Sequence, residues 1–586
     1  MHSYTAPLKE MRFVMKDLSE LEDICALPGH DDIDVETVDA VLEEGAKFAA
    51  EVLAPLNESG DRHGATMDDD GVIEAPGYRD AYQQYTAGGW TTMPCEPEFG
   101  GMGMPHVASS AVSEMWASSN LAFSIGPMLS IGAISALEKH ADDALKNKFL
   151  TKMISGEWTG TMNLTEPQAG SDLAAVRTKA EPNGDHYLIT GTKIYISWGD
   201  HRMTDNIIHL VLARTPGAPD GVKGISMFIV PKFHVNDDGS CGERNDVICS
   251  SIEHKMGIHA SPTCVMNYGE NGGAKGFLVG EENHGLKYMF TMMNGARLHV
   301  GIEGVALGES AYQHAVRYAK ERVQGAPLGQ VVPNTIIKHG DIRRMLLQMR
   351  ALNEAGRAIN YFAASALDRG EKGDKASYKR LEFLTPIAKG WATEVAQEVT
   401  SLGLQIHGGM GFVEETGAAQ FMRDARIITI YEGTTGIQAL DLIGRKILRD
   451  GGTELMSMMG EVQSTLDVLR SDYPQFATIT EELGVALKQW QDASQDISQR
   501  VLEDIDLVGT SSVNYLMLSG TVLGGWLLAK SAIIADSKMA SDESFYSAKI
   551  ATANFFASHI LPRASAYAKA AVADSNVVMG LSEEQF

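Results

Sequence analysis

Residues 423–438 read RDARIITIYEGTTGIQ, and they decide how the whole chain is interpreted. They place one acidic residue, Glu432, between an apolar run and the small-residue turn Gly433–Gly436. A carboxylate at such a boundary is partly desolvated, which raises its pKa and makes it a stronger base once it is ionised. The residues leave a second interpretation open, in which Glu432 only caps a helix beside a turn.

The composition limits the classes of function that fit. A chain of 586 residues is too long for a single hydrophobic core and predicts roughly three or four domains. The net charge of −27 argues against a nucleic-acid partner, because phosphate backbones are bound by clustered Lys and Arg. A local basic pocket for an anionic ligand remains compatible with this charge.

The cysteines and apolar segments bear on the compartment. Five cysteines without CxxC spacing indicate free thiols in a reducing compartment, and we expect a cytoplasmic protein. Charges are scattered through Met1–Glu20, so no signal peptide is expected. The uncharged run Leu507–Ala529 is long enough to span a bilayer, but its Gly, Ser, Thr and Asn residues favour a buried helix. We therefore expect no membrane span.

The first region, residues 1–160, is expected to be mostly helical. Apolar residues recur with a helical period over Val38–Phe48, and further helices are predicted at 108–118 and 128–140. Between them, Gly88–Pro105 is punctuated by Gly and Pro, which predicts a loop.

The second region, residues 161–281, changes to short β-type segments. Tyr187–Ile196 resembles a hairpin, and further strands are predicted at Asn206–Arg214, Gly224–Pro231, Thr263–Tyr268 and Gly276–Val279. Because no helices alternate with these strands, an antiparallel barrel or sandwich is predicted.

Helical periodicity returns over residues 282–450 and continues over 451–586. A helical bundle is predicted for 282–450, with apolar positions that share helix faces at Val305, Tyr312, Ala315 and Ala319, and at Ile342, Met345, Leu346, Met349 and Leu352. Gln324–Asn334 is a Gly- and Pro-containing connector, and Gly451–Gly452 marks the expected start of an additional helical domain. The whole chain is therefore assigned to the α+β class.

Two glycine-rich segments are candidates for nucleotide binding, but neither has a complete nucleotide-binding motif. Gly100–Gly103 and Gly408–Gly411 both fall short of GxGxxG, and neither opens a βαβ unit. A dinucleotide would have to be held by another architecture, and Gly408–Gly411 on its own is more typical of a tight turn between helices. We expect no metal site, because no His, Asp and Glu cluster has ligand spacing.

Polar and basic residues suggest where an anionic ligand could bind. The loop Thr165–Asp172 can clasp a flavin edge or a phosphate with hydroxyls and backbone N–H groups, or it can be an ordinary loop capped by Ser171 or Asp172. Arg297 and Arg322 could each hold a phosphate in a bidentate way, or each could be a solvated helix residue.

Taken together, these segments resemble the acyl-CoA dehydrogenase family. The resemblance is carried, in family order, by PEFGGMG (97–103), MNLTEPQAGSDL (162–173), IYISWG (194–199), NGAR (294–297), ERVQG (321–325), QIHGGMGF (405–412) and the stretch from Arg423. It implies an N-terminal helical domain, a middle antiparallel β-barrel and a C-terminal helical bundle. The added C-terminal block resembles a large subclass. In the family, FAD lies between barrel and bundle, which accounts for the missing βαβ unit.

The resemblance implies a reaction and partners. Glu432 matches the family's base, which removes the α-proton of an acyl-CoA thioester while the β-hydride passes to flavin N5. The backbone N–H of Glu432 and a ribityl hydroxyl would hold the thioester oxygen. The family implies an electron-transfer flavoprotein as acceptor and a homo-oligomer, here expected to be a dimer.

Other site residues are carried over position by position. Residues that match contacts to FAD are Met162, Leu164, Thr165, Tyr195 and Ser197 near the flavin ring, and Arg322, Gln324, Gln405, Gly408, Gly409 and Thr434 near its pyrophosphate and adenosine. Ser171 matches a contact to the pantetheine arm, and Asn294, Arg297 and Gly433 are assigned to the substrate.

Some positions depart from the family pattern. Gly436 stands where many members have a Gln that contacts FAD, and Tyr195 replaces a Trp. The connector after Arg322 is longer than in short members, which blurs the alignment near His339. Alternatives are a fatty acyl-CoA dehydrogenase, an oxidase that uses dioxygen, and a non-catalytic binding protein. Loss of the base would mark the last of these, and Glu432 is present.

Overall fold

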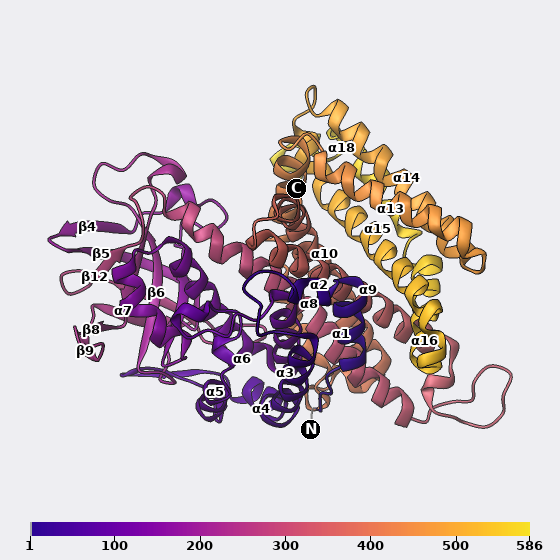
Figure 1. The fold of residues 1–586 in the computed structure, drawn as a ribbon, viewed down its shortest axis with the longest axis horizontal. Helices are drawn as coiled ribbons and strands as arrows, with labels where there is room; N and C mark the ends of the chain where they lie inside the picture. Colours follow the sequence, from indigo (N-terminus) through magenta and orange to yellow (C-terminus); the bar gives the residue numbers. More distant parts are fainter. Residues whose placement is uncertain (1–2) are drawn as a thin grey trace. The chain divides into compact units, whose positions relative to one another are not determined.

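The computed structural model describes residues 3–586, which form two compact units. One unit holds residues up to Ala6 together with Glu43–Pro105 and Met115–Ala296, and the other holds Pro7–Leu42, His106–Glu114 and Arg297–Phe586. The division expected from the sequence, 1–160, 161–281, 282–450 and 451–586, stays a prediction. Figure 1 shows the helices and strands of both units.

The N-terminal part of the chain is helical, as predicted. Its helices are α1 (Leu8–Phe13), α2 (Leu21–Cys25), α3 (Val35–Phe48), α4 (Ala54–His63), α5 (Tyr78–Ala87), α6 (His106–His140) and α7 (Asp143–Ile154). The helix predicted at 38–48 is confirmed as part of α3. The loop over Gly88–Pro105 is confirmed too, with short 3₁₀ turns at Trp90–Thr92 and Pro97–Phe99.

The helices predicted at 108–118 and 128–140 both lie in α6, which Asn120 interrupts. Asn120 leaves the helical backbone at φ −161° and ψ 89°. Its Oδ1 accepts hydrogen bonds from the backbone N–H of Phe123 at 3.1 Å and from the hydroxyl of Tyr78 at 2.9 Å. An Asn side chain that bonds local backbone in this way competes with the helical ladder, which explains the break.

A sheet of eight strands follows in the order β10-β11-β5-β12-β7-β6-β3, with β4 paired to β5. The strands are β3 (Trp158–Asn163), β4 (Lys179–Asn183), β5 (His186–Ser197), β6 (Asn206–Ala213), β7 (Ser226–Pro231), β10 (Val247–Ile252), β11 (Thr263–Tyr268) and β12 (Ala274–Leu278). Two small hairpins, β1 (Thr66–Asp68) with β2 (Gly71–Ile73) and β8 (Phe233–Val235) with β9 (Cys241–Arg244), stand apart from it. The predicted strands at 206–214, 224–231, 263–268 and 276–279 are confirmed.

The pairing is antiparallel except between β3 and β6, which run parallel with Trp158 opposite Asn206. The hairpin predicted at Tyr187–Ile196 is wrong, because β5 is one continuous strand. Gly191 does not make a turn there. A Cβ on Gly191 would lie 2.4 Å from Thr178 Oγ1, so this glycine allows a close approach of neighbouring backbone inside the sheet.

Helices build the bundle of the second unit, which includes α8 from Arg297 onward. They are α8 (Gly285–Glu321), α9 (Gly340–Glu371), α10 (Lys375–His407), α11 (Ala418–Ile428) and α12 (Thr435–Asp441), followed by a π-helical segment at Leu442–Leu448. The predicted face of α9 is confirmed, because Met345, Leu346, Met349 and Leu352 are buried. The connector between α8 and α9 is an extended loop in which the N–H of Gln324 donates to the carbonyl of Asn334 at 3.1 Å.

The C-terminal segment is helical, as predicted. It contains α13 (Thr453–Asp472), α14 (Ala477–Arg500), α15 (Asp506–Lys538), α16 (Glu543–His559), α17 (Arg563–Ala571) and α18 (Asn576–Met579). In the orange and yellow part of Figure 1, α13, α14 and α15 run side by side. A Cβ on Gly520 of α15 would lie 2.2 Å from Trp391 of α10, so small residues let these helices pack closely.

Two helices of residues 3–586 are long and apolar enough to cross a membrane by length and composition, α6 and the segment Asp506–Ser541 that includes α15. The most apolar window of each is mostly buried, at 83% and 78%. The core helix of a soluble protein has the same character. Three glycines of α15 that dilute its apolarity, Gly520, Gly524 and Gly525, lie where an added Cβ would press against a neighbouring helix or loop.

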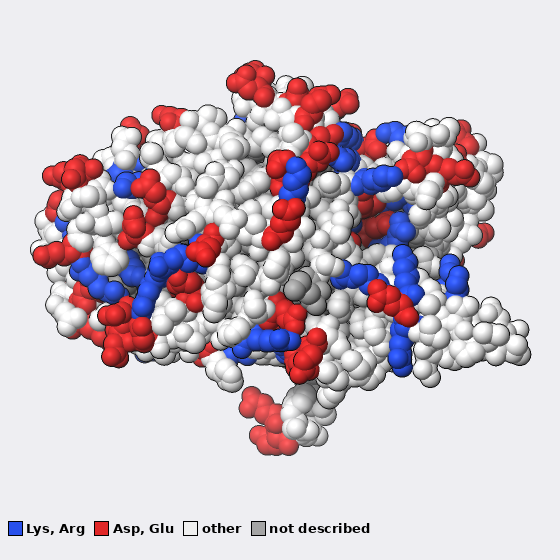
Figure 2. Space-filling model, turned by 90° about the horizontal axis from the view of Figure 1, so that it is seen from below, with Lys and Arg blue, Asp and Glu red and all other residues white. Residues whose placement is uncertain are grey.

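The charged surface and the cysteines agree with what the composition indicated. On the face that Figure 2 shows, acidic and basic side chains are interspersed. All five cysteines are free thiols. The α+β class is confirmed.

Candidate active site

Glu432 lies in a turn between α11 and α12 whose backbone is left-handed. The φ angles of Glu432 and Gly433 are 55° and 93°. This conformation suits glycine and is unfavourable for glutamate, so surrounding groups must hold the turn. The interpretation of Glu432 as a helix cap is wrong, because the hydroxyl of Thr434 caps α12 by accepting from the N–H of Ile437 at 3.3 Å.

Side chains from three helices fix this turn by its carbonyl groups. The carbonyl of Glu432 accepts from Arg297 Nε of α8 at 3.3 Å and from Gln438 Nε2 of α12 at 3.2 Å. The carbonyl of Gly433 accepts from Lys389 Nζ of α10 at 2.7 Å. Because the donors are fixed on rigid helices, they hold the unfavourable backbone conformation in place.

The surroundings of the turn bring the pKa of the Glu432 carboxyl close to neutral pH. The residue as a whole is half-buried, but its carboxyl group lies among protein atoms, and burial raises its pKa to about 7. The positive charges of Arg297 and Lys389 oppose this rise. Burial also lowers the pKa of Lys389 to about 8. A carboxylate with a pKa near the working pH is suited to act as a general base.

A second acid lies beside the turn and was not found from the sequence. Glu303 of α8 is fully buried, and the hydroxyl of Tyr431 donates to its Oε2. Burial, with a smaller contribution from the nearby charge of Glu432, raises the pKa of Glu303 to about 8, although the hydrogen bond from Tyr431 opposes this rise. The ring nitrogen Nε2 of His299 lies 4.0 Å from Glu303 Oε1. A single Glu within a long helix gives no signal in a sequence, because its partner Tyr431 is distant along the chain.

The two arginines considered as anion-binding residues have different environments. Arg297 is 7% exposed, so the interpretation as a solvated helix residue is wrong for it. Besides the carbonyl of Glu432, its Nη1 faces Asp441 Oδ2 at 3.8 Å. Arg322 is exposed, and its Nη2 donates to Gln324 Oε1 at 3.4 Å.

The other predicted cofactor residues of the second unit are accessible. Gln405, Gly408 and Gly409 are exposed at the end of α10. Gly408 has a φ of 59°, and a Cβ placed on Gly408 or Gly409 would meet no atom within 4 Å. Both backbones are therefore open to a ligand. Thr434 is half-buried in the turn beside Glu432.

In the first unit, the structure brings Thr165 next to the strand that carries Tyr195 and Ser197. The carbonyl of Thr165 accepts from the N–H of Ile194 at 2.9 Å. Tyr195 is 61% exposed and has a φ of 59°, whereas Ser197 is half-buried. Met162 lies on β3 and is half-buried, and Leu164 is buried just beyond that strand.

A buried ion pair supports the loop after β3, and it was not predicted from the sequence. Lys193 Nζ lies 2.8 Å from Glu166 Oε1 and donates to the carbonyl of Leu164 at 3.1 Å. Glu166 also accepts from the hydroxyl of Thr178 at 2.6 Å. These contacts hold the pKa of Glu166 at about 2 despite its burial. The alternation of β5 gave a hint, since Lys193 falls on the same face as apolar neighbours.

Two predicted substrate residues lie in exposed positions. Ser171 is exposed, and the neighbouring Asp172 accepts from the N–H of Ala174 at 2.9 Å, as in an ordinary capped loop. Asn294 is exposed on α8.

Within residues 3–586, no group of three or more His, Cys, Asp and Glu residues could hold a metal ion.

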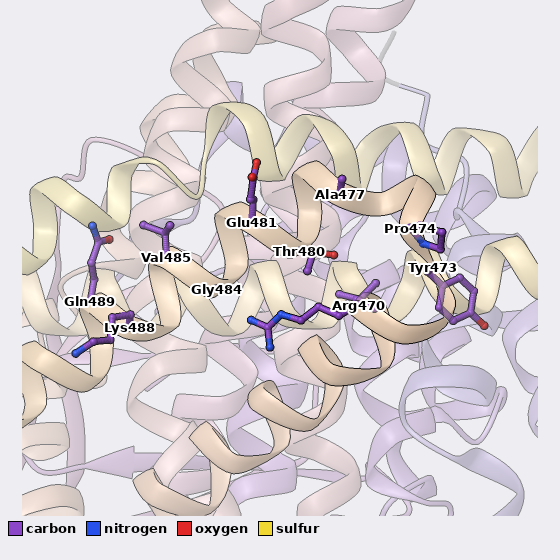
Figure 3. Close-up of a pocket in the computed structure, with 11 residues that line it drawn as sticks. Arg470, Tyr473, Pro474, Ala477, Thr480, Glu481, Gly484, Val485, Lys488 and Gln489 are labelled. Atoms are coloured by element: carbon purple, nitrogen blue, oxygen red, sulfur yellow. The ribbon is translucent and has the colours of Figure 1, made fainter.

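A hollow of about 830 Å³ lies along α13 and α14 (Figure 3). Its lining includes Arg470, Tyr473, Thr480, Glu481 and Lys488. None of its lining residues is a site residue predicted from the sequence. The hollow is therefore a feature of the C-terminal helices and not of the turn at Glu432.

Family models match nearly the whole chain. They are the acyl-CoA dehydrogenase N-terminal domain at residues 36–157, the middle domain at 161–270 and the C-terminal domain at 283–448. A model described as acetyl-CoA dehydrogenase C-terminal like matches 458–582.

Individual proteins agree with these matches. The chain is 45% identical over 575 residues to 3-methylmercaptopropionyl-CoA dehydrogenase of Ruegeria pomeroyi, covering 96% of this chain and 97% of that one. It is 33% identical to a butyryl-CoA dehydrogenase of Syntrophomonas wolfei, and the match covers 100% of this chain and 99% of that one. An acyl-CoA dehydrogenase of Bacillus anthracis complexed with FAD shares the fold, with a TM-score of 0.74, 22% identity and coverage of 95% and 92%. The chain belongs to the acyl-CoA dehydrogenase family.

Proposed function

We propose that this enzyme uses FAD to introduce an α,β double bond into an acyl-CoA thioester, with Glu432 as the catalytic base. The observation that supports this proposal is the turn at Glu432. It presents a carboxyl group with a pKa of about 7 on a left-handed backbone that Arg297, Lys389 and Gln438 hold by its carbonyl groups. A structural cap would need neither a desolvated carboxylate nor a turn whose carbonyl groups are held by side chains from three helices.

Each unit holds residues whose chemistry suits one part of FAD. Tyr195 offers an exposed aromatic ring on a strained backbone, and Thr165 and Ser197 supply hydroxyls nearby. Gly408 and Gly409 leave their backbones open to a ligand. When bound, FAD accepts the β-hydrogen of the substrate as hydride. Met162, Leu164, Arg322, Gln324, Gln405 and Thr434 complete the proposed cofactor contacts.

Glu432 removes the α-proton in the proposed reaction. The thioester oxygen gains negative charge as this proton leaves, and the backbone N–H of Glu432 is assigned to donate to it. The carbonyl of Glu432 is bound by Arg297 and Gln438, which fixes the peptide and the direction of its side chain. Ser171, Asn294 and Gly433 stay proposed substrate contacts, and Arg297 acts near the acyl group.

The substrate that we propose is 3-methylmercaptopropionyl-CoA, which would place the enzyme in dimethylsulfoniopropionate degradation. The support is the 45% identity, along nearly the full length, to the Ruegeria pomeroyi enzyme of that name. A short fatty acyl-CoA is the alternative, supported by the Syntrophomonas wolfei relative.

An electron-transfer flavoprotein is the proposed electron acceptor, in the bacterial cytoplasm. We also propose a homodimer. Its support is the loop between α8 and α9, which projects from the second unit (pink in Figure 1). Leu328 and Val331 of this loop are 104% and 94% exposed. Apolar side chains on a projecting loop are typical of a surface that a second copy covers.

A substrate panel tests the proposed function. Anaerobic mixing of the FAD-loaded enzyme with 3-methylmercaptopropionyl-CoA, butyryl-CoA and a long-chain acyl-CoA should bleach the flavin fastest with the thioether substrate. Faster bleaching by butyryl-CoA would favour the fatty acyl alternative. Admission of air should reoxidise the reduced enzyme slowly. Rapid reoxidation with release of peroxide would instead identify an oxidase.

A further inference from the structure

Tyr431 and Glu303 form a buried contact directly beside the base. Tyr431 immediately precedes Glu432, and its hydroxyl donates to Oε2 of Glu303 on α8. Glu303 is 0% exposed and Tyr431 is half-buried, so the carboxyl side of this contact is shielded from water. Burial, the neighbouring Glu303 carboxyl and the nearby Glu432 hold the pKa of Tyr431 well above its usual range, which keeps the phenol protonated as the donor.

The backbone beside this contact is the strained part of the turn. Arg297, Lys389 and Gln438 hold the carbonyl groups on the C-terminal side, at Glu432 and Gly433. On the N-terminal side, the backbone N–H of Tyr431 donates to the carbonyl of Ile427 at 3.1 Å. The hydroxyl of Tyr431 adds a side-chain anchor to α8. The left-handed Glu432 is therefore clamped from both sides.

We infer that Glu303 is a positioning residue for the reaction, and that it acts through the hydroxyl of Tyr431 to hold the Glu432 turn in its left-handed conformation. This inference rests on the proposed function, because it assumes that Glu432 is the base. Glu303 does not touch substrate or cofactor in this account. Its contribution is geometric, since a base that deviates from its productive direction loses rate steeply.

Charged and titratable groups surround Glu303. His299 lies on the same helix, Lys389 comes from α10, and Tyr431 and Glu432 come from the turn. Burial raises the pKa of Glu303 to about 8, so at pH 7 it is mainly a neutral acid. A glutamine at this position keeps both the neutral charge and an oxygen that accepts from Tyr431.

The test compares variants by the rate of flavin reduction per bound FAD in anaerobic stopped-flow experiments. Tyr431→Phe and Glu303→Leu should each slow reduction by about 10-fold to 100-fold, as expected for loss of one buried hydrogen bond that positions a reacting group. The double variant should be no slower than the slower single variant, because both changes remove the same contact. Glu303→Gln should stay within about threefold of the wild type, since it keeps the acceptor.

A matched control separates positioning from general stability. Tyr361 also donates from a buried hydroxyl to a buried carboxylate, at 2.7 Å from Glu114 Oε2. Tyr361→Phe should lower the melting temperature yet leave the rate per bound FAD unchanged. Rate losses of equal size in Tyr361→Phe and Tyr431→Phe would overturn the inference, and so would a wild-type rate in Tyr431→Phe.

A further comparison distinguishes this inference from the proposed function. Glu432→Gln should bind FAD and lose flavin reduction. If Glu432→Gln is inactive while Tyr431→Phe and Glu303→Leu react at the wild-type rate, the base assignment stands and the positioning role is refuted. If Glu432→Gln reacts normally, the proposed function itself fails.

Discussion

Lys389 Nζ donates to the carbonyl oxygen of Gly433 at 2.7 Å, directly after the proposed base. This contact joins α10 to the turn and brings a positive charge toward the carboxyl of Glu432. The charge lowers the pKa of that carboxyl against the effect of burial. Lys389 therefore both shapes the turn and adjusts the acidity of the base.

The pH dependence of kcat/KM should follow the ionisation of Glu432. Its pKa is raised to about 7, and only the ionised form can take a proton. We expect kcat/KM to fall by about tenfold per pH unit on the acid side of pH 7 and to level off above it. Steady-state measurements with a saturating electron acceptor would show this. A flat profile down to about pH 5 would contradict the assignment.

Replacement of Lys389 should move this profile in a defined direction. Lys389→Met removes a positive charge that stabilises the ionised form of Glu432, so the acid limb should shift upward by roughly one pH unit. Lys446→Met is a suitable control, because Lys446 pairs with Glu382 at 3.2 Å and, among residues 3–586, makes no hydrogen bond or ion pair with the turn. An unshifted limb in Lys389→Met would show that this charge does not act on the base.

Gly433 and Gly436 should respond in opposite ways to alanine. Gly433 has a φ of 93°, and a Cβ there would lie 2.7 Å from Gln438 Nε2. Gly433→Ala should therefore destabilise the protein by about 1–2 kcal/mol. Gly436 lies inside α12, where its added Cβ would meet only Thr434 Oγ1 at 3.7 Å. Gly436→Ala should be neutral or stabilising by up to about 1 kcal/mol. Denaturant unfolding measures both, and equal effects would contradict the geometry of the turn.

The buried acids Glu114 and Glu309 should depend on Arg357. Arg357 is 1% exposed, and its Nη2 lies 2.6 Å from Glu114 Oε1 and 2.9 Å from Glu309 Oε2. Arg357→Met leaves two buried carboxyl groups without their positive partner, and we expect a loss of about 3–5 kcal/mol in unfolding free energy. Arg470→Met, which removes an exposed pair with Asp467, should cost less than about 1 kcal/mol. Similar losses in both variants would refute this role of Arg357.

Local patterns predicted most of the secondary structure, because amphipathic periodicity is a property of neighbouring residues. The face of α9 at Met345 and Met349 is an example. Two features depended on distant parts of the chain and could not be predicted in this way. Gly191 was interpreted as a turn because the close approach of Thr178 is invisible in the sequence. The parallel pairing of β3 with β6 likewise depends on the path of the chain between these two strands, which local patterns do not specify.

The candidate site, too, was predictable where the signal lies in neighbouring residues and not where it depends on distant parts of the chain. The stretch from Arg423 drew attention to Glu432 by a local signal, an acid beside an apolar run and a small-residue turn, and the resemblance to the family selected the base over a helix cap. Its supporting residues come from other helices: Lys389 from α10 and Glu303 from α8. Lys389 could have been suspected, since it is a lone charge in an otherwise buried stretch of α10. Glu303 carried no comparable signal.

Ionisation of Glu432 should also affect stability. Because its pKa is raised in the folded protein, its contribution to stability is present at low pH and is lost as the pH rises through about 7. Glu432→Gln removes this effect, so its melting temperature should gain relative to the wild type between about pH 5 and pH 8. A difference in melting temperature that does not change with pH would contradict a raised pKa for Glu432.

The most direct measurement of the central claim is anaerobic reduction of the bound flavin by 3-methylmercaptopropionyl-CoA in the wild type and in Glu432→Gln. We predict that both proteins bind FAD, that the wild type is bleached rapidly, and that the variant is slower by about three orders of magnitude or more. Rapid bleaching of FAD-loaded Glu432→Gln would contradict the assignment of Glu432 as the base.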